Sequence, residues 1–203
     1  MDNIETYGKQ AAFASLREPA WHMLGTVFQQ EVSTSEMLRL AHLADWDVRL
    51  EPIAFPEDYR VAASAFATLR TNPFDGGTDV LGIVGERYTV FQNEDMFSFG
   101  DNLLDGGRWE TAGSIKQGRV VFASLALNHE VVLDPSGVSD KIDSYLLLST
   151  SHDGSTALQA AVTPVRVVCQ NTLTMGLRQA KQTFKIRHKI GRASCRERVY
   201  VLV

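Results

Sequence analysis

The chain has 203 residues, of which 44% are hydrophobic and 22% charged, and this balance suits one folded domain and excludes a disordered chain. Two cysteines are too few for a disulfide scaffold, and no uncharged run approaches the roughly 20 apolar residues of a membrane span. The net charge is −4, and the N-terminus lacks the basic and apolar regions of a signal peptide, so we expect a soluble, cytoplasmic protein with no membrane partner.

The first part of the chain is weakly patterned. Residues 1–30 show little periodicity and are expected to form an irregular arm that precedes a single α+β domain at residues 31–190. Ser33 and Glu36 have the spacing of a capping box, in which each side chain binds a free backbone amide of the first helical turn. Together with the apolar periodicity of residues 37–44, this spacing predicts an amphipathic helix.

The middle of the chain is predicted to contain short strands, at residues 46–53, 66–71, 80–84 and 88–91. Gly85 and Glu86 separate the last two of these strands, which predicts a hairpin. Asn93 then has the position of a helix cap, with Glu94 and Asp95 in the first turn, where the helix dipole favours acidic side chains.

The last third of the chain is mainly strand, at residues 109–115, 120–127, 145–150 and 157–168. Asp153 and Gly154 predict a type I′ turn between two of these strands, whereas Pro164 predicts a bulge or an edge strand. A final helix is predicted to be capped by Asn171. This order indicates an α+β fold, with a largely antiparallel sheet of hairpins and a meander and about three helices packed on it.

Two glycine motifs have the spacing of known binding loops without their chemistry. Residues 113–120 have the spacing of a phosphate loop, but Arg119 and Val120 replace the Lys and the Ser or Thr that hold phosphate and Mg²⁺. Gly82 and Gly85 have the GxxG spacing of an RNA-binding loop but fall in a predicted strand pair. We therefore predict turns at both places. The five histidines show no close ligand spacing, so we expect no metal and no cofactor.

The candidates for catalysis are Cys169 and His152. Cys169 lies at the predicted start of a helix, where the pKa of a thiol is lowered, and a Cys/His pair would make a nucleophile. A single Cys among valines is more typical of a buried, small hydrophobic residue. We therefore expect a protein that is not an enzyme, and no small-molecule substrate is evident.

Basic residues concentrate near the C-terminus. Residues 178–198 contain eight Lys or Arg and one acid, Glu197, a net +7, whereas the rest of the chain carries 12 positive and 23 negative charges. Such a block is typical of a solvated tail or of a segment that binds nucleic acid. The candidate nucleic-acid-binding residues are Arg166, Arg178, Lys181, Lys185, Arg187, His188 and Lys189.

Arg166 is unusual among these candidates because it lies between two valines in a predicted strand. Such an arginine must reach a polar face, pair with a carboxylate or contact an anion. A structural ion pair is the favoured alternative, and a phosphate-binding surface with the following basic segment is the other. Aromatic side chains that could stack on unpaired bases are Trp21, Trp109 and Tyr145, although each is more typical of a core.

The composition changes abruptly at residues 191–203, with the sequence GRASCRERVYVLV. Three arginines precede an apolar run that continues to the last residue without a turn or a polar cap. Out-of-frame extensions have this character. We therefore expect this tail, with Cys195, to be non-native and the natural protein to be longer; a genuine basic arm is the alternative.

Several stretches resemble a phage- and plasmid-borne family known as domain of unknown function 932. They are AWHMLG at residues 20–25, YTVFQNE at 88–94, TAGS at 111–114, RVVF at 119–122, LLLSTSHDGS at 146–155, TPVRVVCQNT at 163–172 and IRH at 186–188. The resemblance covers residues 17–189 and implies a longer C-terminus.

This resemblance implies a mobile-element context, in a bacterial host or a phage-infected cell, and no catalytic residue is carried over from it. We expect a non-enzymatic accessory of DNA metabolism that binds or anneals single-stranded DNA and forms a homo-oligomer. A Cys/His-dependent enzyme and a module that binds a host protein are the alternatives.

Overall fold

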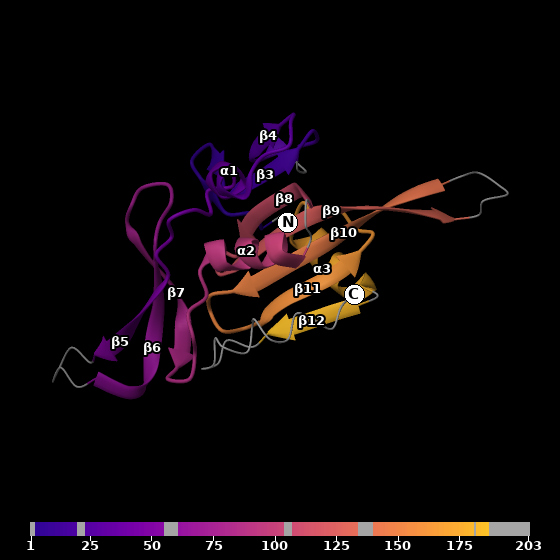
Figure 1. Ribbon diagram of the computed structural model, residues 1–203. Helices are drawn as coiled ribbons and strands as arrows, with labels where there is room; N and C mark the ends of the chain where they lie inside the picture. Colours follow the sequence, from indigo (N-terminus) through magenta and orange to yellow (C-terminus); the bar gives the residue numbers. More distant parts are fainter. Residues whose placement is uncertain are drawn as a thin grey trace.

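The structure, a computed structural model, describes residues 3–19, 23–54, 61–103, 107–133, 140–180 and 182–186. Within these residues lie twelve strands and three helices, and nearly all strand pairs are antiparallel. The predicted α+β class is therefore confirmed. Figure 1 shows a large sheet with helices against it and a smaller group of strands at its side.

The large sheet has seven strands in the order β12-β11-β10-β9-β8-β3-β4. Its strands are β3 (Phe13–Leu16), β4 (Thr26–Phe28), β8 (Arg108–Ile115), β9 (Val120–Leu133), β10 (Asp140–Ser151), β11 (Leu158–Thr163) and β12 (Gln182–Ile186). From β8 to β11 the sheet is a meander of antiparallel neighbours, as predicted. Strand β12, which the sequence analysis did not predict, follows α3 and pairs antiparallel with β11. Figure 1 shows the long β9–β10 hairpin reaching past the strands beside it.

The N-terminal residues are more ordered than expected. The sequence predicts an irregular arm over residues 1–30, whereas β3 lies inside the large sheet, antiparallel to β8 and parallel to β4. All four residues of β3 are buried. A strand this short that is buried on both faces shows no polar and apolar alternation, so it leaves no periodic signal.

A smaller sheet of three antiparallel strands contains β5 (Arg49–Ala54), β6 (Val61–Thr71) and β7 (Thr78–Gly85). A third, two-stranded ribbon joins β1 (Thr6–Tyr7) and β2 (Gln10–Ala11). The predicted hairpin of residues 80–84 with residues 88–91 is wrong, because β7 pairs with β6 across the loop at residues 72–77. Val90 and Phe91 instead pack against the core on the way to α2.

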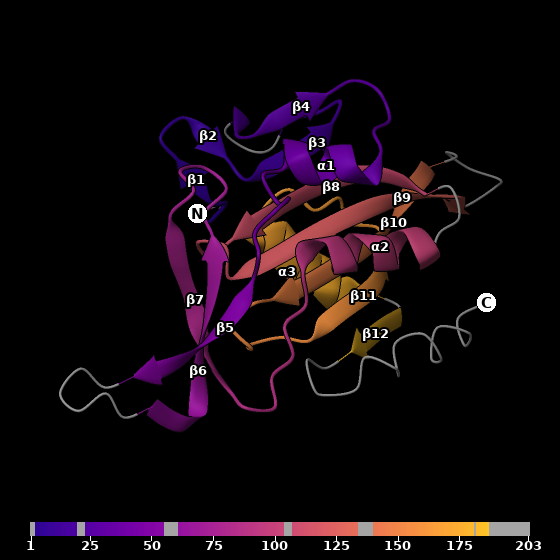
Figure 2. The same cartoon turned by 60° about the vertical axis from the view of Figure 1, so that its left-hand side comes forward.

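Three helices cover the two faces of the large sheet. On one face, α1 (Thr34–Leu40) and α2 (Asn93–Leu103) enclose the larger core, which contains Trp46 and Leu148. On the other face, α3 (Gln170–Gln179) covers a second core, which contains Leu147 and Leu173. Leu147 and Leu148 are adjacent in β10 and therefore mark its two faces. In Figure 2, α2 lies in front of the sheet and α3 behind it.

The predicted helix starts are correct to within two residues. The Ser33 hydroxyl accepts a hydrogen bond from the Glu36 amide at 3.3 Å, as the capping box predicts. Helix α2 begins at Asn93, but the Asn93 side chain is buried and donates to the Leu43 carbonyl at 2.8 Å. Helix α3 is capped at Cys169, two residues before the predicted Asn171.

Two connections lie at the end of the large sheet near the N-terminus: the turn between β8 and β9 and the loop between β10 and β11. Lys116, Gln117 and Gly118 have φ of +54°, +57° and +80°, so the predicted turn between β8 and β9 is present in place of a phosphate loop. Between β10 and β11, only Gly154 has a positive φ, of +75°. The predicted type I′ turn is therefore wrong there, and a loop of residues 152–157 joins the two strands.

Candidate nucleic-acid interface

The candidate interface is the outer surface of α3 and β12. Phe184 and Ile186 of β12 pack against the core that α1 and α2 cover. Because side chains alternate along a strand, Lys185 points to the opposite side of the sheet, which is the side of α3. Lys185 is exposed, and so is Arg178 in the last turn of α3. The structure therefore brings these two predicted residues to one side of the sheet.

Helix α3 lies close to the sheet because of one glycine. A Cβ atom at Gly176 would lie 3.1 Å from Leu147 Cδ2, closer than most such contacts. Leu173 is buried beside it, and the outward positions are polar or flexible. The exposed side chains of α3 and β12 are Asn171, Thr174, Met175, Arg178, Gln179, Gln182, Thr183 and Lys185.

The elements that form this surface carry basic side chains and no acidic ones. No Asp or Glu occurs between residues 154 and 196, a stretch that contains all of β11, α3 and β12. Neither Arg178 nor Lys185 forms an ion pair within the described residues. The predicted residues Lys181, Arg187, His188 and Lys189, together with Trp21 and the tail at 191–203, lie outside the described residues.

Arg166 is held inside the protein rather than presented to a ligand. Its Nε atom donates to Glu110 Oε1 at 2.9 Å, and its Nη2 atom donates to Ser15 Oγ at 2.7 Å and to the Leu16 carbonyl at 3.0 Å. Its side chain is 20% exposed. The structural ion pair that the sequence analysis favours is thus present, and it ties the segment after β11 to β3 and β8.

The aromatic residues named for base stacking are core residues where the structure describes them. Trp109 is buried, with its ring centroid 4.6 Å from that of Phe97. Tyr145 is also buried, and burial together with the nearby carboxylates of Glu110 and Asp143 raises the pKa of its hydroxyl to about 12. Neither ring offers a free face to a nucleobase.

Cys169 and His152 do not form a catalytic pair. Cys169 is 7% exposed, and its Sγ atom lies 3.5 Å from Thr172 Oγ1 at the start of α3. His152 is buried on the opposite face of the sheet, where its ring lies 5.7 Å from that of Trp46 and its Nε2 atom 2.9 Å from Asn93 Oδ1. The sheet separates the two side chains, which leaves no route for proton transfer between them.

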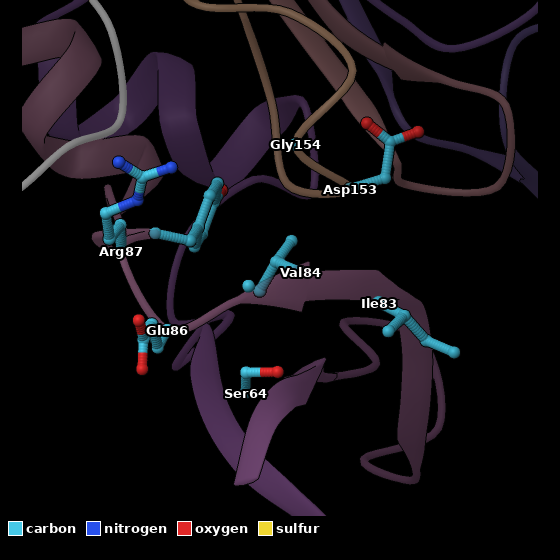
Figure 3. Close-up of a pocket in the computed structure, with 9 residues that line it drawn as sticks. Ser64, Ile83, Val84, Glu86, Arg87, Asp153 and Gly154 are labelled. Atoms are coloured by element: carbon cyan, nitrogen blue, oxygen red, sulfur yellow. The ribbon is translucent and has the colours of Figure 1, made fainter. Parts of the chain in front are cut away.

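A pocket of about 500 Å³ lies between β7 and the β10–β11 loop (Figure 3). Figure 3 shows Arg87 and Asp153 on opposite sides of it. Burial acts to raise the pKa of Asp153, but hydrogen bonds from Ser155 and Ser151 and the charge of Lys116 hold it below its usual value. Asp153 is therefore an ionised turn residue, and the pocket presents no acid and base pair.

The structure also contains a charged cluster that sequence reasoning missed. Arg70 is 1% exposed, and its Nε and Nη2 atoms donate to Asp79 Oδ2 at 3.0 and 2.8 Å. Its Nη1 atom donates to Glu5 Oε2 at 3.1 Å, and its guanidinium carbon lies 4.1 Å from the centre of the Trp46 ring. Glu5 and Arg70 are far apart in sequence, so no local pattern announces this pair.

The model of a family described as "Domain of unknown function (DUF932)" matches residues 80–199, which is more than half of the chain. The chain belongs to this family. The match to the DUF932 family begins within β7 and includes α2, α3 and strands β8 to β12. It reaches residue 199, within the tail whose non-native origin stays a prediction.

Neither the curated proteins nor the solved structures contain a match to this DUF932 protein. Within the described residues, no three His, Cys, Asp or Glu side chains are grouped so that they could hold a metal ion. The helices that the structure describes are also too short or too polar to cross a membrane.

Proposed function

We propose that the DUF932 protein binds single-stranded DNA through the outer surface of α3 and β12, without enzymatic chemistry. The observation that carries this proposal is the pair of exposed basic residues, Arg178 and Lys185, on one side of the sheet and on elements that contain no acidic residue. In the cell, this activity would serve annealing in phage or plasmid DNA metabolism.

The distribution of charge supports a polyanionic partner for this surface. The chain as a whole is acidic, and a uniformly acidic surface would repel DNA. A basic surface without acidic residues would attract DNA to one side of the molecule, while the acidic residues elsewhere would repel it. The exposed amide of Asn171 and the exposed hydroxyl of Thr183 add donors of the kind that contact phosphate oxygens.

The enzymatic alternative has less support because its two candidate residues lie on opposite faces of the sheet. Cys169 is buried against Thr172, and His152 is buried against Asn93 and Trp46. A nucleophile needs its base within hydrogen-bond reach. A module that binds a host protein stays a prediction.

Fluorescence anisotropy of labelled single- and double-stranded DNA, titrated at several salt concentrations, tests the proposal. We expect tighter binding of single strands and an affinity that falls with salt, because neutralised phosphates release counterions. The variants Arg178→Ala and Lys185→Ala should each reduce the salt dependence by about 0.7 in the log–log slope, the value for one phosphate of a single strand. Light scattering with and without DNA would measure whether the protein self-associates, as annealing of two strands would favour.

The matched control is Arg39→Ala. Arg39 is also an exposed arginine in the last turn of a helix, but α1 lies on the opposite face of the sheet. This variant should bind DNA like the wild type. Equal affinities and slopes for all three variants, or no binding of single strands at low salt, would refute the proposal.

A further inference from the structure

A second pocket, of about 450 Å³, lies at the end of the large sheet beside the N-terminus. Residues 3–7, the loop that follows β6 and the β8–β9 turn form its walls. Polar and aromatic side chains meet there, among them Tyr7, Asn72, Phe74, Gln117 and Arg119. A concave site with a few convergent polar groups is the usual form of a small-ligand site.

The aromatic wall of this pocket is the stacked pair of Tyr7 and Phe74. The rings of Tyr7 and Phe74 are nearly parallel, at 5°, with centroids 5.6 Å apart. The ring of His42 also lies beside Phe74, with centroids 4.8 Å apart and the two planes tilted by 40°. Tyr7, at the outer end of the stack, is 48% exposed. An exposed ring that is held by stacking on a neighbour is a suitable surface for stacking another planar group.

The charges of the pocket leave one cation available. Glu5 and Asp79 both line it, and the single buried guanidinium of Arg70 binds both carboxylates, so these three groups carry a net charge of −1. Arg119 is exposed and forms no ion pair within the described residues. Its backbone is fixed, because the Arg119 carbonyl accepts a hydrogen bond from the His152 amide at 2.8 Å. The pocket therefore combines an exposed aromatic face with an available guanidinium.

The pocket also adjoins the first residue of α3. The side-chain amide of Asn3, on the pocket wall, donates to the side-chain oxygen of Gln170, the first residue of α3. Arg178 lies near the other end of this ten-residue helix, about 15 Å long at 1.5 Å per residue. One strand could therefore contact Arg178 and the pocket at the same time.

We propose that this pocket binds one unpaired nucleobase of single-stranded DNA, with the base stacked on Tyr7 and the adjoining phosphate on Arg119. The inference rests on the proposed function and adds base stacking to it. Since every base has an aromatic face, stacking of this kind tolerates any sequence. Gln117 and Asn72 lie at the same site, as polar neighbours of the bound base.

The test compares Tyr7→Ala, Tyr7→Phe and Arg119→Ala in the full chain, by anisotropy with an oligothymidine of about 16 nucleotides. Tyr7→Ala should bind about 5-fold to 150-fold more weakly with an unchanged salt slope, which is the range for loss of one stacked base. Tyr7→Phe keeps the ring and should bind like the wild type. Arg119→Ala should reduce the salt slope by about 0.7.

A phosphate-linked oligomer of the same length that lacks bases separates stacking from structural damage. The wild type and Tyr7→Ala should bind this oligomer equally, because neither can stack on it. If Tyr7→Ala weakens its binding as much as that of oligothymidine, Tyr7 has a structural role and the inference is wrong.

The same titrations distinguish failure of this inference from failure of the proposed function. If Arg178→Ala and Lys185→Ala weaken binding while Tyr7→Ala and Arg119→Ala do not, DNA contacts α3 and β12 but not the pocket, and only the inference is overturned. If the wild type does not bind oligothymidine at low salt, both are overturned.

Discussion

The turn between β8 and β9 closes over the buried charge of Arg70, and the variant Gly118→Ala tests how strictly this arrangement constrains the turn. Gly118 has φ of +80°, in the left-handed region that favours glycine. A Cβ atom there would lie under 3.0 Å from three atoms of the Arg70 guanidinium. The guanidinium cannot move aside freely, because Glu5 and Asp79 both bind it.

The expected loss of stability has two parts. An alanine at positive φ costs about 1–2 kcal/mol, of which about 0.4–1 kcal/mol is returned because alanine has less freedom than glycine in the unfolded chain. Displacing Arg70 from its carboxylates would leave buried charges without partners, which costs about 3–5 kcal/mol. We therefore expect Gly118→Ala to lower the free energy of unfolding by about 4 kcal/mol, a large part of the 5–15 kcal/mol typical of a domain.

The variant Gly8→Ala isolates the first part. Gly8 also has a positive φ, of +60°, but a Cβ atom at this position would meet nothing within 4 Å. We expect it to cost about 1 kcal/mol. Equilibrium unfolding in urea measures both variants, with tryptophan fluorescence as the signal, because the buried Trp46 ring contacts Arg70. If Gly8→Ala and Gly118→Ala lower the free energy of unfolding equally, an alanine at position 118 does not displace Arg70 from its carboxylates. That result would refute this reasoning.

Three further predictions concern the second face of the sheet. In the wild type, the raised pKa keeps the Tyr145 hydroxyl protonated in the folded state at a pH where it ionises in the unfolded state, so stability should fall between pH 10 and about 12. Tyr145→Phe should remove this fall. Unfolding at about pH 9 and about pH 11 measures it, and an equal fall in the wild type and the variant would contradict the prediction. Arg166→Ala should lower the free energy of unfolding by about 2 kcal/mol, because it removes a charged hydrogen bond to the buried Glu110 and leaves that carboxylate, among the described residues, only Arg108 at 3.9 Å, and it should leave the DNA affinity of the folded protein unchanged. Cys169 should react with an alkylating reagent only at the rate of unfolding, as its burial requires, and rapid labelling of the native protein near neutral pH would restore the enzymatic hypothesis.

Features that depend on residues close together in the sequence were predicted correctly. The Ser33 cap is present, and so is the meander from β8 to β11, because the cap and the turns between successive strands depend on residues close together in the sequence. The predicted hairpin around Gly85 is wrong because its pairing depends on residues that are distant in the sequence. Both flanking runs suit a strand, but residues 88–91 pack against the core, and β7 finds its partner in β6. Strand pairing is a tertiary choice that propensity does not determine.

The residues of the candidate site likewise fall into two groups: those that the sequence identifies and those that only the fold brings together. Arg178 and Lys185 could be identified from the sequence because an acid-free stretch is visible in composition. The stacked rings of Tyr7 and Phe74 could not, because they come from separate segments that meet only in the folded chain. For the same reason, the sequence did not decide between the ion pair and the phosphate site for Arg166, whose partner Glu110 lies in β8.

The position of β3 has a consequence for how the chain is made. Its antiparallel partner, β8, lies about 90 residues further along the sequence. At a synthesis rate of roughly 5–20 residues per second, the ribosome needs roughly 5 to 20 seconds to deliver that partner. During this interval Phe13 and its neighbours leave the exit tunnel without the strand that will bury them, and they are accessible to chaperones. The first strand of the large sheet to be synthesised therefore waits for β8 before it can pair with its antiparallel partner.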